Sequence, residues 1–151
     1  MSQKHKKNQE PDILQVIVVG IFKMIWWILT LPFKGLRRGK SGLSVEKKNY
    51  IASKRQEIIG LSESQSIIEL KHAVMEADKL VDFTLKNKGF AGETFADRLR
   101  SAESSMSKDV YNSVWTGHKV RNQIAHESES RIEYGELRGA IDQLLKYTRA
   151  I

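Results

Sequence analysis

Arg121, Asn122 and His126 bring three chemically capable groups together in one short stretch of the chain. Arg121 carries a permanent cation whose planar fork of donors suits a phosphate, and His126 can exchange a proton near neutral pH. Asn122 and His126 are four residues apart, so they share a face of an α-helix. Arg121 is rotated further round that helix and reaches the same ligand only if its side chain swings over or the helix frays near His126. These groups are the ingredients of phosphodiester cleavage without a metal.

The pattern around this motif predicts a helix over residues 108–126. Ser107 has N-cap character and Asp109 suits the first turn. Apolar residues recur at spacings of three and four, and a second stripe of aromatic and polar groups runs beside them. That second stripe consists of Tyr111, Trp115, His118, Asn122 and His126. Such a stripe suits a site or an interface, with Trp115 and His118 as supporting residues. The alternative is that His126 only interacts with the helix C-terminus and Trp115 fills the core.

Residues 114–127, which read Val-Trp-Thr-Gly-His-Lys-Val-Arg-Asn-Gln-Ile-Ala-His-Glu, resemble the signature helix of the HEPN domains. Those domains are small all-α bundles whose active members carry Arg-x(4–6)-His, usually with a polar residue after the Arg. The resemblance covers about residues 44–151. It implies a dimerising helical bundle and a metal-independent endoribonuclease that leaves a 2′,3′-cyclic phosphate. Arg121 and His126 would be catalytic and Asn122 their polar neighbour. Many domains of this superfamily are binding or assembly modules, so the resemblance bears on fold more than on activity.

Composition narrows the class of protein. The chain has 151 residues, 40% of them hydrophobic and 28% charged, which fits one globular domain with an appendage. The absence of cysteine excludes disulfides and thiolate zinc sites. The four histidines show no metal-ligand spacing, and no Gly-rich phosphate loop is present, so we expect neither a metal nor a cofactor.

The net charge of +7 belongs entirely to the N-terminal part. Residues 1–48 hold ten Lys and Arg against three Asp and Glu, whereas residues 49–151 hold fifteen of each. The C-terminal domain is therefore neutral and lacks the basic footprint of a strong nucleic-acid binder. This neutrality argues against broad, tight RNA binding, but it does not argue against a small catalytic cleft.

An N-terminal membrane anchor is predicted after a disordered basic tail at residues 1–12. Residues 13–33 are almost wholly apolar and, as a helix, are long enough to cross a hydrocarbon core of about 30 Å. The interfacial aromatics and the basic residues that follow are Trp26, Trp27, Lys34, Arg37 and Arg38. Lys23 in mid-span and a polar stripe leave a second possibility, in which the helix lies flat in the interface. We favour a single-pass transmembrane helix.

The basic residues after this segment slightly outnumber those before it, which favours a cytoplasmic C-terminal domain. Residues 34–43 form a basic, Gly-containing linker that could lie on an anionic membrane surface. A membrane anchor would restrict the domain to one surface or couple it to a membrane protein partner.

The rest of the chain, residues 44–151, predicts an all-α helical bundle of four to five helices. We expect helices from Ser44 to about residue 59, ended by Gly60, and from Ser62 or Ser64 to about residue 86. A short helix over about 94–104, the motif helix, and a last helix over about 133–150 follow. The apolar faces are Ile67, Leu70, Val74, Ala77, Val81 and Leu85 on the second helix, and Leu137, Ile141, Leu144 and Leu145 on the last. No segment shows strand-like alternation, and the connections are short.

Glu76 and Asp78 on the second helix are candidates for orienting Arg121 or His126. The alternative is a solvated acidic face beside Lys79 and Asp82. Three functions stay open: an RNA-cleaving homodimer, a membrane-tethered binding or dimerisation module, and a structural protein whose motif is coincidental.

Overall fold

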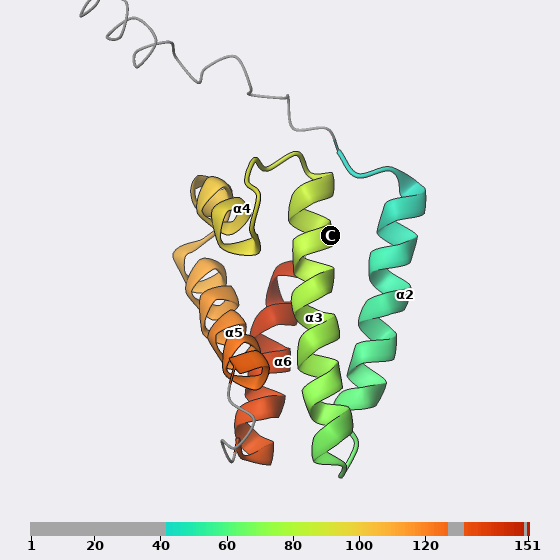
Figure 1. Cartoon of the computed structure of the whole chain (residues 1–151). Coiled ribbons are helices and arrows are strands. Elements are labelled where there is room, and N and C mark those ends of the chain that lie inside the picture. Colours follow the sequence, from blue (N-terminus) through green and yellow to red (C-terminus); the bar gives the residue numbers. More distant parts are fainter. Residues whose placement is uncertain (1–41, 127–131, 150) are drawn as a thin grey trace, which may run out of the picture. The chain divides into compact units, whose positions relative to one another are not determined.

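The computed structural model describes residues 42–126, 132–149 and 151. This part of the chain folds into five α-helices and one short 3₁₀-helix, with no β-strand among them (Figure 1). The elements are α2 (Val45–Ser62), α3 (Ile67–Asn87), α4 (Phe95–Ala102), η2 (Glu103–Ser105), α5 (Lys108–His126) and α6 (Tyr134–Thr148). The prediction of an all-α helical bundle is confirmed.

Hydroxyl side chains begin four of these helices. Ser44 caps α2 by accepting from the Lys47 backbone N–H, and Ser66 caps α3 by accepting from that of Glu69. At α4, Thr94 and Asp97 form a reciprocal capping box. Ser107 accepts from the Val110 N–H at the start of α5, as the sequence predicted.

Two predicted boundaries differ from the structure. Gly60 lies inside the last turn of α2, which continues to Ser62. The second helix begins after Ser66 because the Ser64 hydroxyl accepts from the Ser66 N–H, which holds these residues in a turn. The end of α3 follows the prediction, since Gly89 adopts φ 84°, a conformation that glycine accepts without strain.

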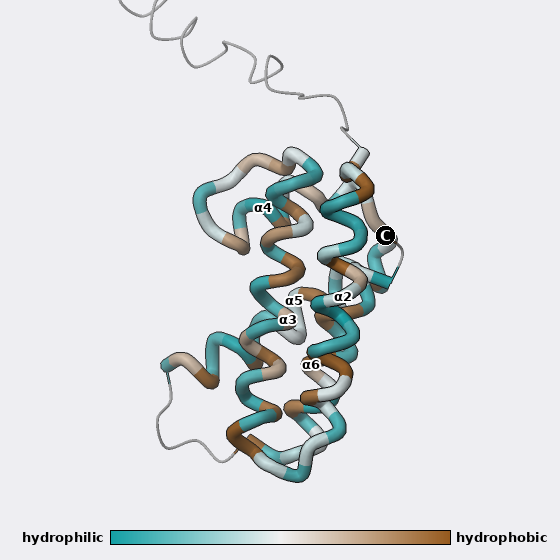
Figure 2. Tube along the Cα trace, turned by 90° about the vertical axis from the view of Figure 1, so that its right-hand side faces the viewer, coloured by the Kyte–Doolittle hydropathy of each residue, from teal (hydrophilic) through white to brown (hydrophobic). Residues whose placement is uncertain are grey.

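The core lies between α3 and the helices that surround it. α3 packs against α2, α4, α5 and α6, and the most extensive contact is that of α5 with α6. Five of the six predicted apolar residues of α3 are buried, and Ile67 is partly buried; all four predicted on α6 are buried. Figure 2 shows hydrophobic residues recurring along the helices between hydrophilic ones, the pattern of amphipathic helices around a shared core.

The predicted tail, membrane segment and linker up to residue 41 lie outside the described residues. The same holds for Trp26, Trp27, Lys34, Arg37 and Arg38. Among the helices that the structure describes, none combines the length and apolar character needed to cross a bilayer.

Candidate functional site

The motif helix α5 approaches α6 closely at Gly117. A Cβ atom on Gly117 would lie 2.5 Å from Leu144 Cγ and 2.9 Å from the Ala140 carbonyl oxygen. Only a residue without a side chain permits this approach, and Gly117 is accordingly buried. The next residue, His118, is thereby carried into the interior of the bundle, where it is 8% exposed.

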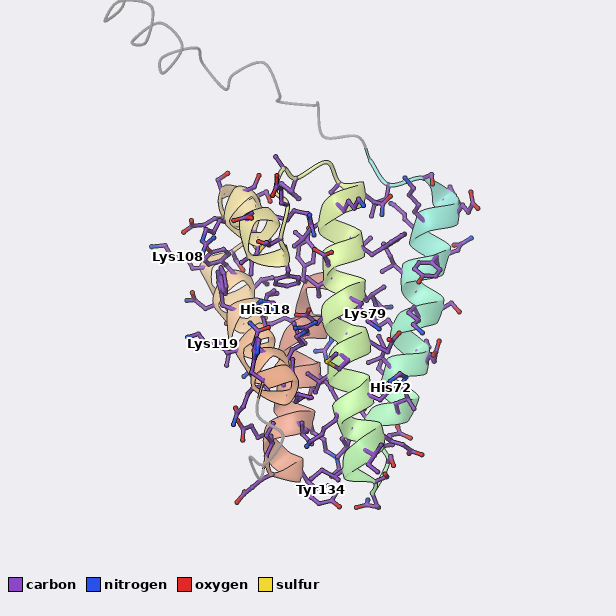
Figure 3. All side chains as sticks on the ribbon, in the orientation of Figure 1. His72, Lys79, Lys108, His118, Lys119 and Tyr134 are labelled. Carbon is purple, nitrogen blue, oxygen red and sulfur yellow. The ribbon has the colours of Figure 1, made fainter. Side chains whose placement is uncertain are left out.

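His118 is held by a buried carboxylate from another helix. Its Nδ1 lies 2.7 Å from Oδ1 of Asp78 on α3, and Asp78 is only 6% exposed. Phe95 of α4 stacks on the imidazole with ring centroids 4.1 Å apart and planes 10° apart. Figure 3 labels His118 on the side of α5 that faces α3. The ring is thus fixed by a hydrogen bond on one edge and by an aromatic ring on one face.

Arg121 shares the same carboxylate. Its Nε lies 3.6 Å from Oδ2 of Asp78, and its Nη1 donates to Oδ1 of Asn122 at 3.2 Å. The side chain retains 31% exposure. The guanidinium of Arg121 is therefore held at the edge of the bundle by Asp78 and Asn122, with part of its surface open to a ligand.

His126 lies elsewhere. It is the last residue of α5 and is exposed, and no described residue bonds to its side chain or stacks on its ring. Five residues of α-helix correspond to about 7.5 Å of rise and about 140° of rotation. One copy of the helix therefore does not present Arg121 and His126 on one face. The helix also continues to His126 without fraying.

The aromatic half of the predicted stripe forms a cluster beside His118. Trp115 contacts the His118 ring edge-on at 6.0 Å and Tyr111 edge-on at 6.2 Å. The Arg100 guanidinium lies 5.6 Å from the Trp115 ring centroid, in cation–π geometry, and also pairs with Asp97. Trp115 is only partly buried, so the cluster keeps some of its aromatic surface in contact with solvent.

Glu76 takes no part in this cluster. Its carboxylate binds Lys79 at 2.8 Å and Lys54 at 3.0 Å, and the Lys79 hydrogen bond lowers the pKa of Glu76 below its usual range. The acidic residue that does reach Arg121 is Asp78. Its sequence position carried a signal, because it lies four residues after Val74 and three before Val81, within the buried stripe of α3. A charge in an apolar stripe needs a partner.

The described residues contain no group of three or more His, Cys, Asp or Glu side chains placed to hold a metal ion. Comparison of the chain with family models, curated proteins and solved structures gave no match. The interpretation of the site therefore depends on its own geometry and on the residues of α5.

Proposed function

We propose that the helical bundle is a HEPN-like domain that cleaves RNA without a metal, using Arg121 and His126, with Asn122 as their polar neighbour. The observation that carries this proposal is that Arg121 is held in place and yet partly exposed. Its guanidinium is oriented by Asp78 and Asn122, yet part of the side chain stays exposed, and the same helix ends at the exposed His126. A cation fixed before the ligand arrives stabilises developing charge on a phosphate more effectively than a mobile one.

The reaction is a transesterification. The 2′-oxygen of the RNA attacks phosphorus, the bond from phosphorus to the 5′-oxygen breaks, and a 2′,3′-cyclic phosphate remains. Arg121 binds the phosphate oxygens. His126 in its protonated form gives a proton to the departing 5′-oxygen, while the 2′-hydroxyl proton passes to a base.

A second copy of the chain completes this site. Because Arg121 and His126 diverge by about 140° on one helix, an Arg121 from one copy and a His126 from the other can meet the same phosphate across a two-fold axis. The active species is then a homodimer. The apolar segment at residues 13–33 would anchor it in a membrane, with the domain on the cytoplasmic side. The basic linker would contact anionic lipid, and the anchor could join a membrane protein partner.

The test is RNA cleavage by the purified 151-residue chain in detergent, without added metal and with a chelator present. We expect cyclic phosphate ends from the wild type and loss of cleavage in Arg121→Ala and His126→Ala. His72→Gln, which removes an exposed histidine of α3, is the matched control and should cut at the wild-type rate. Equal cleavage by wild type and His126→Ala would refute the assignment.

Mixing the two inactive variants tests the shared site. Random exchange of Arg121→Ala and His126→Ala copies places both intact residues in about one quarter of the sites when each site takes one residue from each copy. We therefore expect roughly that fraction of wild-type activity to return. A mixture as inactive as its components would show that each site lies within one copy.

A second candidate is a non-catalytic, membrane-tethered binding or dimerisation module. The partly exposed cluster of Tyr111, Trp115 and Arg100 favours it, because aromatic residues and arginine are enriched at protein interfaces. In that case Trp115→Ala would weaken self-association in sedimentation experiments. Neither the wild type nor His126→Ala would cleave RNA.

A further inference from the structure

We propose that His118 and Arg121 together bind the phosphodiester, and that Asp78 is the positioning residue for both. This inference rests on the proposed function for its catalytic meaning, but the binding site it describes can be tested without catalysis. The ligand class is a ribose phosphodiester, bound through its phosphate oxygens and its 2′-hydroxyl.

Asp78 can hold both groups only as a carboxylate. Oδ1 accepts from Nδ1 of His118 at 2.7 Å, and Oδ2 lies 3.6 Å from the Nε of Arg121. An amide in the same place would offer one acceptor and would turn its NH₂ group toward the other donor. The buried charge of Asp78 is compensated by Arg121, as a buried carboxylate requires.

The second ring nitrogen of His118 is left for a ligand. With Nδ1 bonded to Asp78, the neutral imidazole carries its proton on Nδ1 and presents Nε2 as an acceptor. No described residue bonds to Nε2. Among the described residues, the only buried side-chain polar atom without a partner is the Tyr147 hydroxyl, so Nε2 of His118 keeps contact with solvent.

His118 is also the histidine that shares a face with Arg121. The two are three residues apart, which corresponds to about 60° of rotation and about 4.5 Å of rise. In the proposed reaction, Nε2 of His118 takes the 2′-hydroxyl proton while Arg121 holds the phosphate, and His126 of the other copy protonates the leaving 5′-oxygen. Trp115 is next to the imidazole and partly exposed, and a base that stacks on the ring face covered by Arg100 would take the place of that guanidinium.

The charges around the imidazole balance before a ligand binds. Asp78 of α3 faces Arg121 of α5, Arg100 of α4 is paired with Asp97, and Arg98 of α4 is paired with Asp82 of α3. We therefore expect weak binding that depends on orientation more than on net charge.

The first experiment uses the isotopically labelled 151-residue chain in detergent and a ribodinucleotide whose bridging 5′-oxygen is replaced by a methylene group, so that it keeps its 2′-hydroxyl but cannot be cleaved. Nuclear magnetic resonance reads the ring signals of every histidine. We expect the His118 signals and the Arg121 Nε signal to shift in a saturable way, while those of the exposed His72 stay in place. A titration that leaves His118 unshifted overturns the proposal.

The second experiment tests the positioning role. The nitrogen shifts of unliganded His118 should report a proton on Nδ1, and Asp78→Asn should alter that tautomer or release Arg121. The same variant should weaken dinucleotide binding at least about tenfold and, where the wild type cleaves RNA, slow cleavage by about a hundredfold or more. An Asp78→Asn chain that keeps the tautomer and the affinity refutes the role of Asp78.

The outcomes separate the two proposals. If the dinucleotide shifts His118 and the wild type cuts no RNA, the phosphodiester site stands and the catalytic function falls. If the wild type cuts RNA and His118→Gln, shown to be folded by circular dichroism, cuts equally well, the catalytic function stands and the role of His118 is wrong.

Discussion

Replacing Gly117 with alanine should destabilise the domain by forcing α5 away from α6. The added Cβ would lie 2.5 Å from Leu144 Cγ and 2.9 Å from the Ala140 carbonyl oxygen. Carbon atoms in contact ordinarily sit about 3.5 Å apart, so the helices must separate by roughly 1 Å. Leu144 is fully buried and Ala140 contributes backbone, so neither neighbour can simply turn aside.

The magnitude follows from two opposing effects. Overpacking in a close-packed core costs up to about 3 kcal/mol, and the better helix propensity of alanine returns about 1 kcal/mol. We therefore expect the free energy of unfolding of Gly117→Ala to fall by about 2 kcal/mol. For a domain of this size, that lowers the Tm by roughly 10 °C. The assay is thermal unfolding followed by circular dichroism, supported by urea titration.

Gly139→Ala is the matched control. Gly139 lies within α6, and a Cβ there would meet no atom within 4 Å. The same chemical change should therefore stabilise the protein by up to about 1 kcal/mol, through helix propensity alone. If both variants shift the Tm in the same direction by similar amounts, the close approach at Gly117 is not what holds α5 in place.

Two further predictions concern the free energy of unfolding. Arg98 donates to both carboxylate oxygens of Asp82, at 2.8 and 2.9 Å, and to the Gly92 carbonyl at 2.7 Å, so Arg98→Ala should lower the free energy of unfolding measured in urea by about 1 to 3 kcal/mol. Arg149→Ala, which removes the exposed pair with Asp142, should change it hardly at all. The buried Tyr147 hydroxyl has no partner among the described residues, so Tyr147→Phe should be neutral or stabilising by up to about 1 kcal/mol. Burial raises the pKa of Tyr147 from 10.0 to about 12, so as the pH rises the unfolded chain releases the phenolic proton before the folded chain does. The free energy of unfolding of the wild type should therefore fall between pH 10 and 12, and Tyr147→Phe should not show this fall.

The helices could be predicted from sequence because their determinants are local. Nine of the ten residues that apolar spacing selected on α3 and α6 are buried, although the structure buries seven others on these helices as well. Ser44 and Ser107 marked helix starts through their own side chains. Where local signals competed, prediction was wrong. Gly60 was expected to end α2, but an isolated glycine is tolerated within a helix at a cost of about 1 kcal/mol, and α2 continues for two more residues.

The candidate site could be predicted only in part, because its central contact spans forty residues of sequence. Asp78 and His118 meet through the packing of α3 against α5, which no local pattern specifies. Sequence reasoning weighed Glu76 and Asp78 alike, and two lysines of α2 and α3 hold Glu76 away from the motif. Proximity of Arg121 and His126 along the chain likewise suggested a shared site that the geometry of one helix does not provide.

The two imidazoles of α5 therefore depend differently on a second copy of the chain. His118 and His126 are separated by about 12 Å of helix rise, too far apart to serve one phosphate group from the same copy with Arg121 between them. His118 meets Arg121 through Asp78 in every copy, whether or not the chain associates. His126 can contact a bound phosphate only when Arg121 of another copy holds that phosphate nearby. A monomeric chain that still binds the dinucleotide would thus make Asp78, His118 and Arg121 the whole binding site. The role of His126 would then be confined to the catalytic step, which requires the second copy.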